Sequence, residues 1–202
     1  MYRNRIKRLL DILLSACGIL CLSWLLLILA VAIKLDSPGP VFFRQKRVGV
    51  GKRHFQILKF RTMRIDCPHD MPTHLLHDPE QYITRMGRFL RKTSLDELPQ
   101  LWNILVGDMA VIGPRPALWN QYDLLAERDK YGANAVRPGL TGWAQIHGRD
   151  ELEIAEKAKL DGWYAEHISF GLDVKCFFGT ITAVLRHDGV VEGGTGTLHD
   201  EK

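Results

Sequence analysis

The sequence predicts an α+β protein that is mostly helical, and three kinds of pattern indicate this fold class. An uncharged, strongly apolar run occupies residues 12–33. Two short strand patterns, 41–43 and 55–58, flank a glycine-containing turn at 49–52 and predict a small β-hairpin. Helical patterns follow at 82–92, 97–106, 151–164 and 172–185. For 202 residues, one domain plus a membrane anchor is expected.

The composition is mildly basic, which favours anionic partners. The net charge is +4 and the isoelectric point is near 8.9. Lipid headgroups, phosphates and nucleic acids all fit this charge. We expect no nucleic-acid partner, because the arginines are dispersed and no recognition helix stands out. The four cysteines form no Cys-x-x-Cys pair, so a reducing setting without disulfides is expected.

The apolar run is long enough to enter a membrane. Its 22 residues would form a helix about 33 Å long, and the run exceeds that of a typical signal peptide. Basic residues flank both ends, so the positive-inside rule places both ends in the cytosol. A re-entrant hairpin satisfies this rule and a straight span does not, yet the residues alone leave both open. Ser23 could bond back to a carbonyl and bend the helix, although no proline is present.

Glycine and proline divide the remaining chain. Residues 36–40 (DSPGP) predict a turn that ends the membrane helix. Residues 66–79 predict a solvated loop, because a metal site is disfavoured by the irregular spacing of its histidines, His69, His74 and His77. The helix at 82–92 carries a basic face that is either solvated or laid on anionic lipid, formed by Arg85, Arg88 and Lys92.

Asp96 and Glu97 are the candidate catalytic residues. We expect Asp96 to cap the helix at 97–106, with Pro99 as its third residue and Gly107 ending it. Two adjacent carboxylates suit Mg²⁺, which takes one or two protein carboxylates together with substrate phosphate oxygens. An aspartate can also carry a phosphoryl group covalently.

A purely structural alternative exists for the same residues. Ser94 and Glu97 match the Ser-x-x-Glu capping box that starts a helix, and this interpretation is compatible with a catalytic pair. Three arginines near the pair in sequence supply forked donors that match phosphate geometry: Arg91, Arg115 and Arg137. Arg115 lies between two prolines, and Arg137 precedes one.

These residues lie in longer motifs that resemble a known family. The motifs are residues 59–63 (KFRTM), 94–103 (SLDELPQLWN), 107–109 (GDM), 112–116 (IGPRP) and 137–145 (RPGLTGWAQ), followed by Asp161, Tyr164, Ser169, Asp173 and Lys175. The chain resembles the bacterial sugar transferases, the monotopic polyprenyl-phosphate phosphoglycosyl transferases of the small type.

The resemblance implies a reaction and roles. A nucleoside-diphosphate sugar, expected to be a UDP-sugar, gives its sugar-1-phosphate to polyprenyl (undecaprenyl) phosphate and releases UMP, with Mg²⁺ as cofactor. Asp96 would be the nucleophile, and Glu97 would help it to hold the metal. The remaining assigned residues would bind substrate phosphate: Arg91, Arg115, Arg137, Lys59 and Arg61. This step begins capsule, lipopolysaccharide or exopolysaccharide synthesis, so glycosyltransferases of the same pathway are expected partners.

The resemblance also implies a location. It implies a re-entrant helix in segment 1–36, with both termini cytosolic, at the cytoplasmic face of the inner membrane. The catalytic domain would span 37–188, use interfacial amphipathic helices, and precede a disordered tail at 189–202. The chain departs from the family at the membrane break, where Ser23 and Trp24 replace the usual Ser-Pro pair.

Two other functions compete with this one. Asp96 could act as a general base in direct, single-step transfer. The chain could instead be a non-catalytic membrane scaffold for glycan assembly, in which Asp96 and Glu97 only cap a helix.

Overall fold

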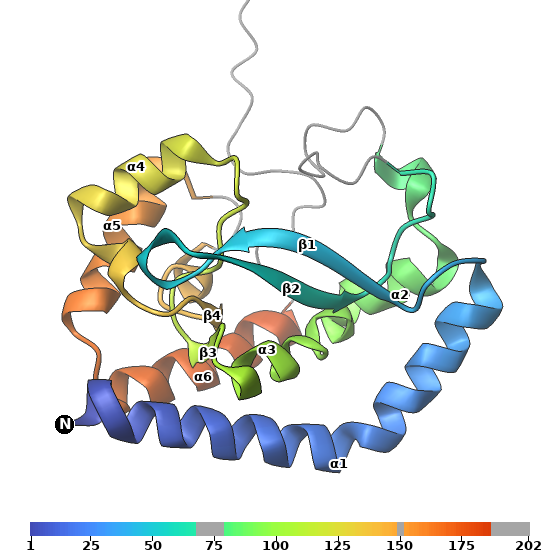
Figure 1. The fold of residues 1–202 in the computed structure, drawn as a ribbon, viewed down its shortest axis with the longest axis horizontal. Helices are drawn as coiled ribbons and strands as arrows, with labels where there is room; N and C mark the ends of the chain where they lie inside the picture. The colour runs from blue at the N-terminus through green and yellow to red at the C-terminus, as the bar shows by residue number, and fades with distance from the viewer. Residues whose placement is uncertain (68–78, 149–151, 187–202) are drawn as a thin grey trace, which may run out of the picture.

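The structure is a computed structural model that describes residues 1–67, 79–148 and 152–186. The predicted tail at 189–202 lies outside the described residues, as does most of the predicted loop at 66–79 with its three histidines. The described part is mostly helical, which confirms the predicted balance of helix and strand. Figure 1 shows a small hairpin above one long N-terminal helix, with shorter helices packed between and beside them.

The long helix α1 (Lys7–Asp36) continues from the helical turn η1 (Tyr2–Ile6). It ends as predicted, because Ser37 precedes a proline and has the extended backbone that this position favours. Figure 1 shows that α1 bends and wraps around one side of the domain. Inside α1 the Ser23 hydroxyl donates to the Leu20 carbonyl at 2.9 Å, which is the back-bond that the sequence predicted.

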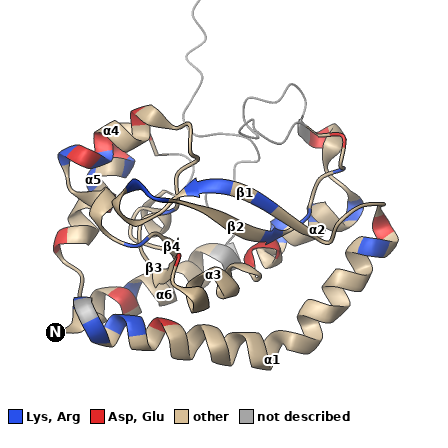
Figure 2. Cartoon of the chain, in the orientation of Figure 1, with Lys and Arg blue, Asp and Glu red and all other residues tan. Residues whose placement is uncertain are grey.

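Helix α1 is apolar along its length, and it is the one helix in the described residues that is long and apolar enough to cross a membrane. Figure 2 shows its charges near its two ends only. Large apolar side chains are exposed on the face turned away from the domain: Leu9, Leu13, Leu14, Leu20, Trp24, Leu27, Ile28, Val31 and Leu35. A face of this kind needs an apolar environment outside the chain.

The N-terminal part of α1 is fixed to the domain by polar contacts. The Lys7 ammonium lies 2.6 Å from an Asp173 carboxylate oxygen, and the Arg8 guanidinium donates to two carbonyls near the end of helix α3 (Gln100–Val106). The buried Asp11 carboxylate accepts from the Val111 N–H of strand β3 (Ala110–Ile112) at 2.9 Å.

The C-terminal part of α1 is fixed mainly by apolar contacts. Leu29 and Ile33 are buried in one cluster with Phe60 and Leu90. The Asp36 carboxylate accepts from the Met86 N–H at 3.0 Å. Both ends of the helix are therefore docked on the same domain.

The predicted hairpin is present and longer than expected. Strand β1 (Phe42–Val48) pairs antiparallel with β2 (His54–Phe60), and the turn between them includes η2 (Val50–Lys52). The helix α3 (Gln100–Val106) packs under β2 through the buried Asn103, whose amide donates to the Gln56 carbonyl and accepts from the Leu58 N–H, both at 2.8 Å.

A second, parallel pair of strands was not predicted. Strand β3 (Ala110–Ile112) pairs with β4 (Gly139–Thr141), where the sequence indicated only turns and loops. Three residues are too few to display the alternation that marks a strand. The pairing matters because it places the segments that follow the two strands at one edge.

The remaining helices surround these strands. Helix α2 (Arg85–Thr93) follows η4 (Pro79–Tyr82), and α5 (Ile154–Glu166) and α6 (Phe170–Arg186) confirm two predicted helices with shifted ends. The sequence analysis missed α4 (Tyr122–Lys130) and the short turns η6 (Ala133–Ala135) and η7 (Gln145–His147). On α2, the predicted basic face is exposed to the outside: Arg85, Arg88 and Lys92.

Gly87 lets α2 approach the segment after β2, and its replacement tests this packing. A Cβ at Gly87 would lie 1.9 Å from the Thr62 carbonyl oxygen. Gly87→Ala should therefore lower the free energy of unfolding by about 1–3 kcal/mol, measured by thermal or denaturant unfolding. Gly171→Ala in α6 is the control, because a Cβ there would meet no atom within 4 Å apart from its chain neighbours and its own helix backbone. Equal stability of both variants would contradict this packing.

Candidate active site

The predicted carboxylate pair lies in a tight turn between two helices. Asp96 and Glu97 belong to the 3-10 turn η5 (Leu95–Glu97), between α2 and α3. The helix α3 begins only at Gln100, so the predictions that Asp96 caps it and that Pro99 is its third residue are wrong. Pro99 instead directly precedes the helix, where its fixed φ suits a helix start.

The capping box between Ser94 and Glu97 does not form. Ser94 has a left-handed backbone, φ 56°, and its N–H closes α2 on the Arg91 carbonyl at 3.1 Å. Its side chain makes no capping hydrogen bond. Ser94 therefore ends α2 instead of starting α3. Because no capping box forms, the Glu97 side chain can bind other partners.

Glu97 is bound by two cations from separate elements. The Lys59 ammonium of β2 and the Arg115 guanidinium each lie 2.8 Å from Glu97 Oε1. Burial alone would raise the pKa of the Glu97 carboxyl. The charges and hydrogen bonds of Arg115 and Lys59 outweigh burial and hold its pKa well below the usual range. These contacts therefore favour the ionised form of Glu97.

Asp96 lies beside Glu97 in a different electrostatic environment. Its carboxylate is 3.9 Å from the Lys59 ammonium, and 13% of its side chain is exposed. Burial raises the pKa of the Asp96 carboxyl, Lys59 opposes the rise, and the negative charge of Glu97 adds to it. Of two adjacent carboxylates, the structure keeps one tightly paired and leaves the other less restrained.

Two predicted phosphate-binding arginines lie near the pair. The charges of Arg91 and Arg115 both lower the pKa of Asp96. The Arg91 Nε donates to the Thr62 hydroxyl at 3.0 Å, which fixes its position beside Asp96. Arg115 follows β3 between two prolines, as the sequence indicated.

The structure places two other predicted residues elsewhere. The guanidinium of Arg61 is bound to the Ser37 and Pro38 carbonyls and holds the segment that follows α1. Arg137 donates from Nε to the Gly107 carbonyl at 2.8 Å, at the far end of α3 from the carboxylate pair. Neither is brought to Asp96 and Glu97.

A buried ion pair that the residue patterns did not reveal supports Arg115. Arg128 of α4 donates to the Arg115 carbonyl at 2.9 Å and lies 2.5 Å from an Asp161 carboxylate oxygen of α5. Asp161 was noted only through the family resemblance. Arg128 lies in a stretch where the sequence showed neither a helical pattern nor a motif, so its role became visible only in the structure.

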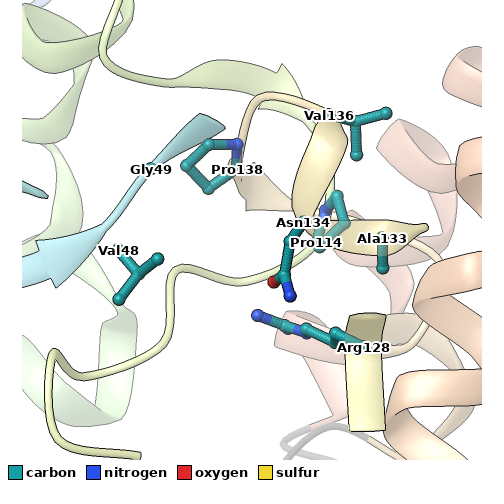
Figure 3. A pocket seen from close by; sticks show the side chains of 8 residues that line it. All are labelled: Val48, Gly49, Pro114, Arg128, Ala133, Asn134, Val136 and Pro138. Atoms are coloured by element: carbon teal, nitrogen blue, oxygen red, sulfur yellow. The ribbon is translucent and has the colours of Figure 1, made fainter. Parts of the chain in front are cut away.

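A small pocket lies next to this ion pair. It separates the end of β1 from η6 and from the segment after β3. Figure 3 shows Arg128 and Asn134 on one wall and apolar groups around them; the lining consists of Val48, Gly49, Pro114, Arg128, Ala133, Asn134, Val136 and Pro138. It contains neither Asp96 nor Glu97.

The donor set of the pair fits a magnesium ion. In the described residues no group of three or more His, Cys, Asp or Glu side chains could hold a metal. Mg²⁺ in phosphate-handling sites needs only one or two carboxylates, since water and substrate phosphate complete its shell. Glu97 Oε1 is taken by two cations, whereas no hydrogen bond is formed by Asp96 carboxylate oxygens in the described contacts.

Comparison with known proteins assigns the family. A model of the bacterial sugar transferases matches residues 2–187, and the chain belongs to this family. The uncharacterized sugar transferase EpsL of Bacillus subtilis is 40% identical, over 92% of this chain and 90% of that protein. The family predicted from the motifs is thereby confirmed.

Two relatives carry names that state a reaction. The UDP-N-acetylgalactosamine-undecaprenyl-phosphate N-acetylgalactosaminephosphotransferase of Aeromonas hydrophila is 43% identical over 89% of this chain and 44% of that protein. The UDP-glucose:undecaprenyl-phosphate glucose-1-phosphate transferase of Escherichia coli is 42% identical over 88% of this chain and 40% of that protein. The chain spans less than half of these two relatives.

The position of Lys59 predicts how Asp96 titrates. The Lys59 charge lowers the pKa of Asp96, so Lys59→Met should raise that pKa further, and Asp96 should ionise at higher pH than in the unchanged protein. The measurement is a titration of ¹³C-labelled aspartate carboxyl signals. Lys92→Met, which removes an exposed charge of α2, should leave the titration unchanged. An unaltered Asp96 titration in Lys59→Met would refute this electrostatic coupling.

Proposed function

We propose that this protein transfers sugar-1-phosphate from a UDP-sugar to undecaprenyl phosphate and releases UMP, as the first membrane step of surface glycan synthesis. The observation that carries the proposal is the partly buried Asp96 beside a Glu97 that two cations hold ionised. The names of the two undecaprenyl-phosphate transferases support the substrates.

In the proposed mechanism, Asp96 is the nucleophile. A carboxylate oxygen of Asp96 forms a bond to the sugar-bearing phosphorus of the donor, and the bond from that phosphorus to the bridging oxygen breaks, which releases UMP. A phosphate oxygen of undecaprenyl phosphate then attacks the same phosphorus. This second step frees the Asp96 carboxylate and leaves a lipid-linked diphosphate sugar.

The neighbouring residues would support each step through charge. Glu97 holds Lys59 and Arg115 at one carboxylate oxygen. Their positive charges would reduce the repulsion between the anionic donor and the anionic Asp96 nucleophile. Asp96 and Glu97 would hold Mg²⁺, which when bound screens the repulsion between carboxylate and diphosphate. Arg91, fixed by Thr62, adds a cation on the Asp96 side.

Direct transfer with Asp96 as general base is the second candidate. It is favoured by one observation, the burial that raises the pKa of Asp96 toward the range of a useful base. The acceptor argues against it, since a phosphate monoester is already largely ionised at neutral pH and needs little help from a base. A scaffold role is disfavoured, because η5 does not cap a helix through Ser94.

Both ends of α1 dock on one domain, which supports a re-entrant helix. The Lys7 and Arg8 contacts fix the N-terminal end, and the contacts of Ile33 and Asp36 fix the other. A helix that crossed the bilayer would place those ends on opposite sides. We propose that the exposed face of α1 enters the cytoplasmic leaflet and that both of its ends remain in the cytosol.

The covalent route predicts a trapped intermediate. Incubation with a UDP-sugar labelled in its sugar-bearing phosphate, with Mg²⁺ and without lipid acceptor, should label the protein; Asp96→Asn should abolish labelling and lower turnover by about 10³-fold or more. The measurement is radioactivity retained on denatured protein, with unfolding curves as the check of fold. Full activity with no retained label and ternary-complex kinetics would favour direct transfer.

The re-entrant helix predicts the accessibility of its flanks. Single cysteines at Arg3 and at Arg44, in a background without the native cysteines, should both be shielded from an impermeant maleimide until the cytoplasmic membrane is opened. Arg44 is exposed on β1, so its labelling after lysis serves as the positive control. Labelling of position 3 alone in intact spheroplasts would establish a spanning helix instead.

A further inference from the structure

Arg47 of β1 lies beside the Arg115 segment although it is far from it in sequence. Arg47 forms an isolated antiparallel bridge with Leu118, and the Val48 N–H donates to the Ala117 carbonyl at 2.9 Å. The end of β1 is thus paired through its backbone with the residues that follow Arg115. Figure 2 shows basic positions along β1. Among these residues, Arg47 donates to the Pro116 carbonyl of this segment, and Lys46 lies over the Trp119 ring.

The hydrogen bonds of Arg47 go to neutral acceptors. Its Nη1 donates to the Pro116 carbonyl at 3.1 Å, and its Nη2 donates to the Gln45 side-chain oxygen at 2.7 Å. Within the part of the chain that the structure describes, no carboxylate lies within ion-pair distance of Arg47, and its buried Nε has no hydrogen-bond partner. A guanidinium removed from water without an anion is costly to the fold.

A comparison within the same protein shows how a structural arginine is accommodated. Arg128 is buried, and Asp161 pairs with it at 2.5 Å. Arg47 instead faces a second cation, Arg115, and the Glu97 carboxylate acts on it from beyond ion-pair distance. Burial, and then the charge of Arg115, lower the pKa of Arg47 to about 10, so it remains charged at neutral pH.

The charges around the carboxylate pair leave room for an anion. Lys59, Arg91 and Arg115 act on Asp96, and Arg47 is acted on by Arg115 and Glu97. A phosphate-bearing substrate would bring negative charge to this group of cations.

We propose that Arg47 and Arg115 together form a two-arginine cradle for a substrate phosphate, with Arg47 as a binding residue that the sequence motifs did not assign. The proposal rests on the proposed function for the identity of the substrates. Arg115 is shared with Glu97, whereas Arg47 has no acidic partner in the described residues, so Arg47 is the member that gains most from a bound phosphate. The diphosphate of a nucleotide and the phosphate of a polyprenyl lipid share this chemistry.

The test removes the Arg47 charge and measures binding to each source of phosphate. Arg47→Gln should weaken UDP binding by about 10- to 100-fold in calorimetry of the purified full chain, or should raise KM for polyprenyl phosphate by a similar factor. The first result assigns the cradle to the nucleotide, the second to the lipid. Arg47→Lys should recover part of the loss, because it keeps the charge without the fork.

The matched control is Arg44→Gln on the same strand. It removes the same charge from the opposite, exposed face of β1 and should change both constants less than twofold. Thermal unfolding of all variants separates an effect on binding from an effect on folding. If Arg47→Gln unfolds at a lower temperature than the unchanged protein, the UDP affinity and the KM of Arg47→Lys, compared with those of the unchanged protein, test the cradle instead.

The proposed function and the cradle fail in different ways. An unchanged protein that neither binds UDP nor transfers sugar phosphate refutes the proposed function. An unchanged protein that does both, while Arg47→Gln and Arg47→Lys keep its UDP affinity and its KM for lipid, refutes the cradle alone. Equal weakening by Arg47→Gln and Arg44→Gln would also refute it, because a general loss of positive charge would then explain the effect.

Discussion

The ion pairs of Glu97 hold the site together. One carboxylate receives Lys59 from the hairpin and Arg115 from the segment after β3, while its own backbone lies in the turn between α2 and α3. Three parts of the chain that are remote in sequence thus meet at one carboxylate oxygen. Where water is largely excluded, such a cluster of charges is favourable only when all of its partners are present. The charge balance of the site therefore depends on the fold that brings Lys59 and Arg115 to Glu97.

The same segment after β3 is restrained from several sides. The Gly113 N–H donates to the Thr141 carbonyl at 2.8 Å, Arg128 binds the Arg115 carbonyl, and Arg47 binds the Pro116 carbonyl. Two prolines limit its backbone further. A guanidinium that must meet a phosphate in one geometry benefits from such a rigid support, because little ordering remains to be done when the substrate arrives.

Sequence reasoning found the elements with strong local signals. The long apolar helix, the hairpin and the helices near the C-terminus have periodic patterns, and Gly107 ends α3 at φ 104° as predicted. The family motifs led to Asp96, Glu97, Lys59, Arg91 and Arg115, which the structure gathers in one place.

What the sequence could not supply was long-range pairing. Strands β3 and β4 are three residues each, and their partners are remote in the chain. The cap at Asp96 was wrong because Ser94 adopts a left-handed backbone that favours glycine, a choice that local propensity does not reveal. Arg61 and Arg137 share the motifs of the site, yet each binds backbone carbonyls elsewhere. Motifs identify residues that matter without stating where they lie.

The contact between Lys7 and Asp173 bears on how the chain is assembled during synthesis. The two residues are 166 positions apart, and Tyr2 and Tyr164 also bind the Asp173 carboxylate. Helix α1 is synthesised before α6, which carries this anchor. Docking of α1 through Asp173 can therefore begin only after α6 has been synthesised.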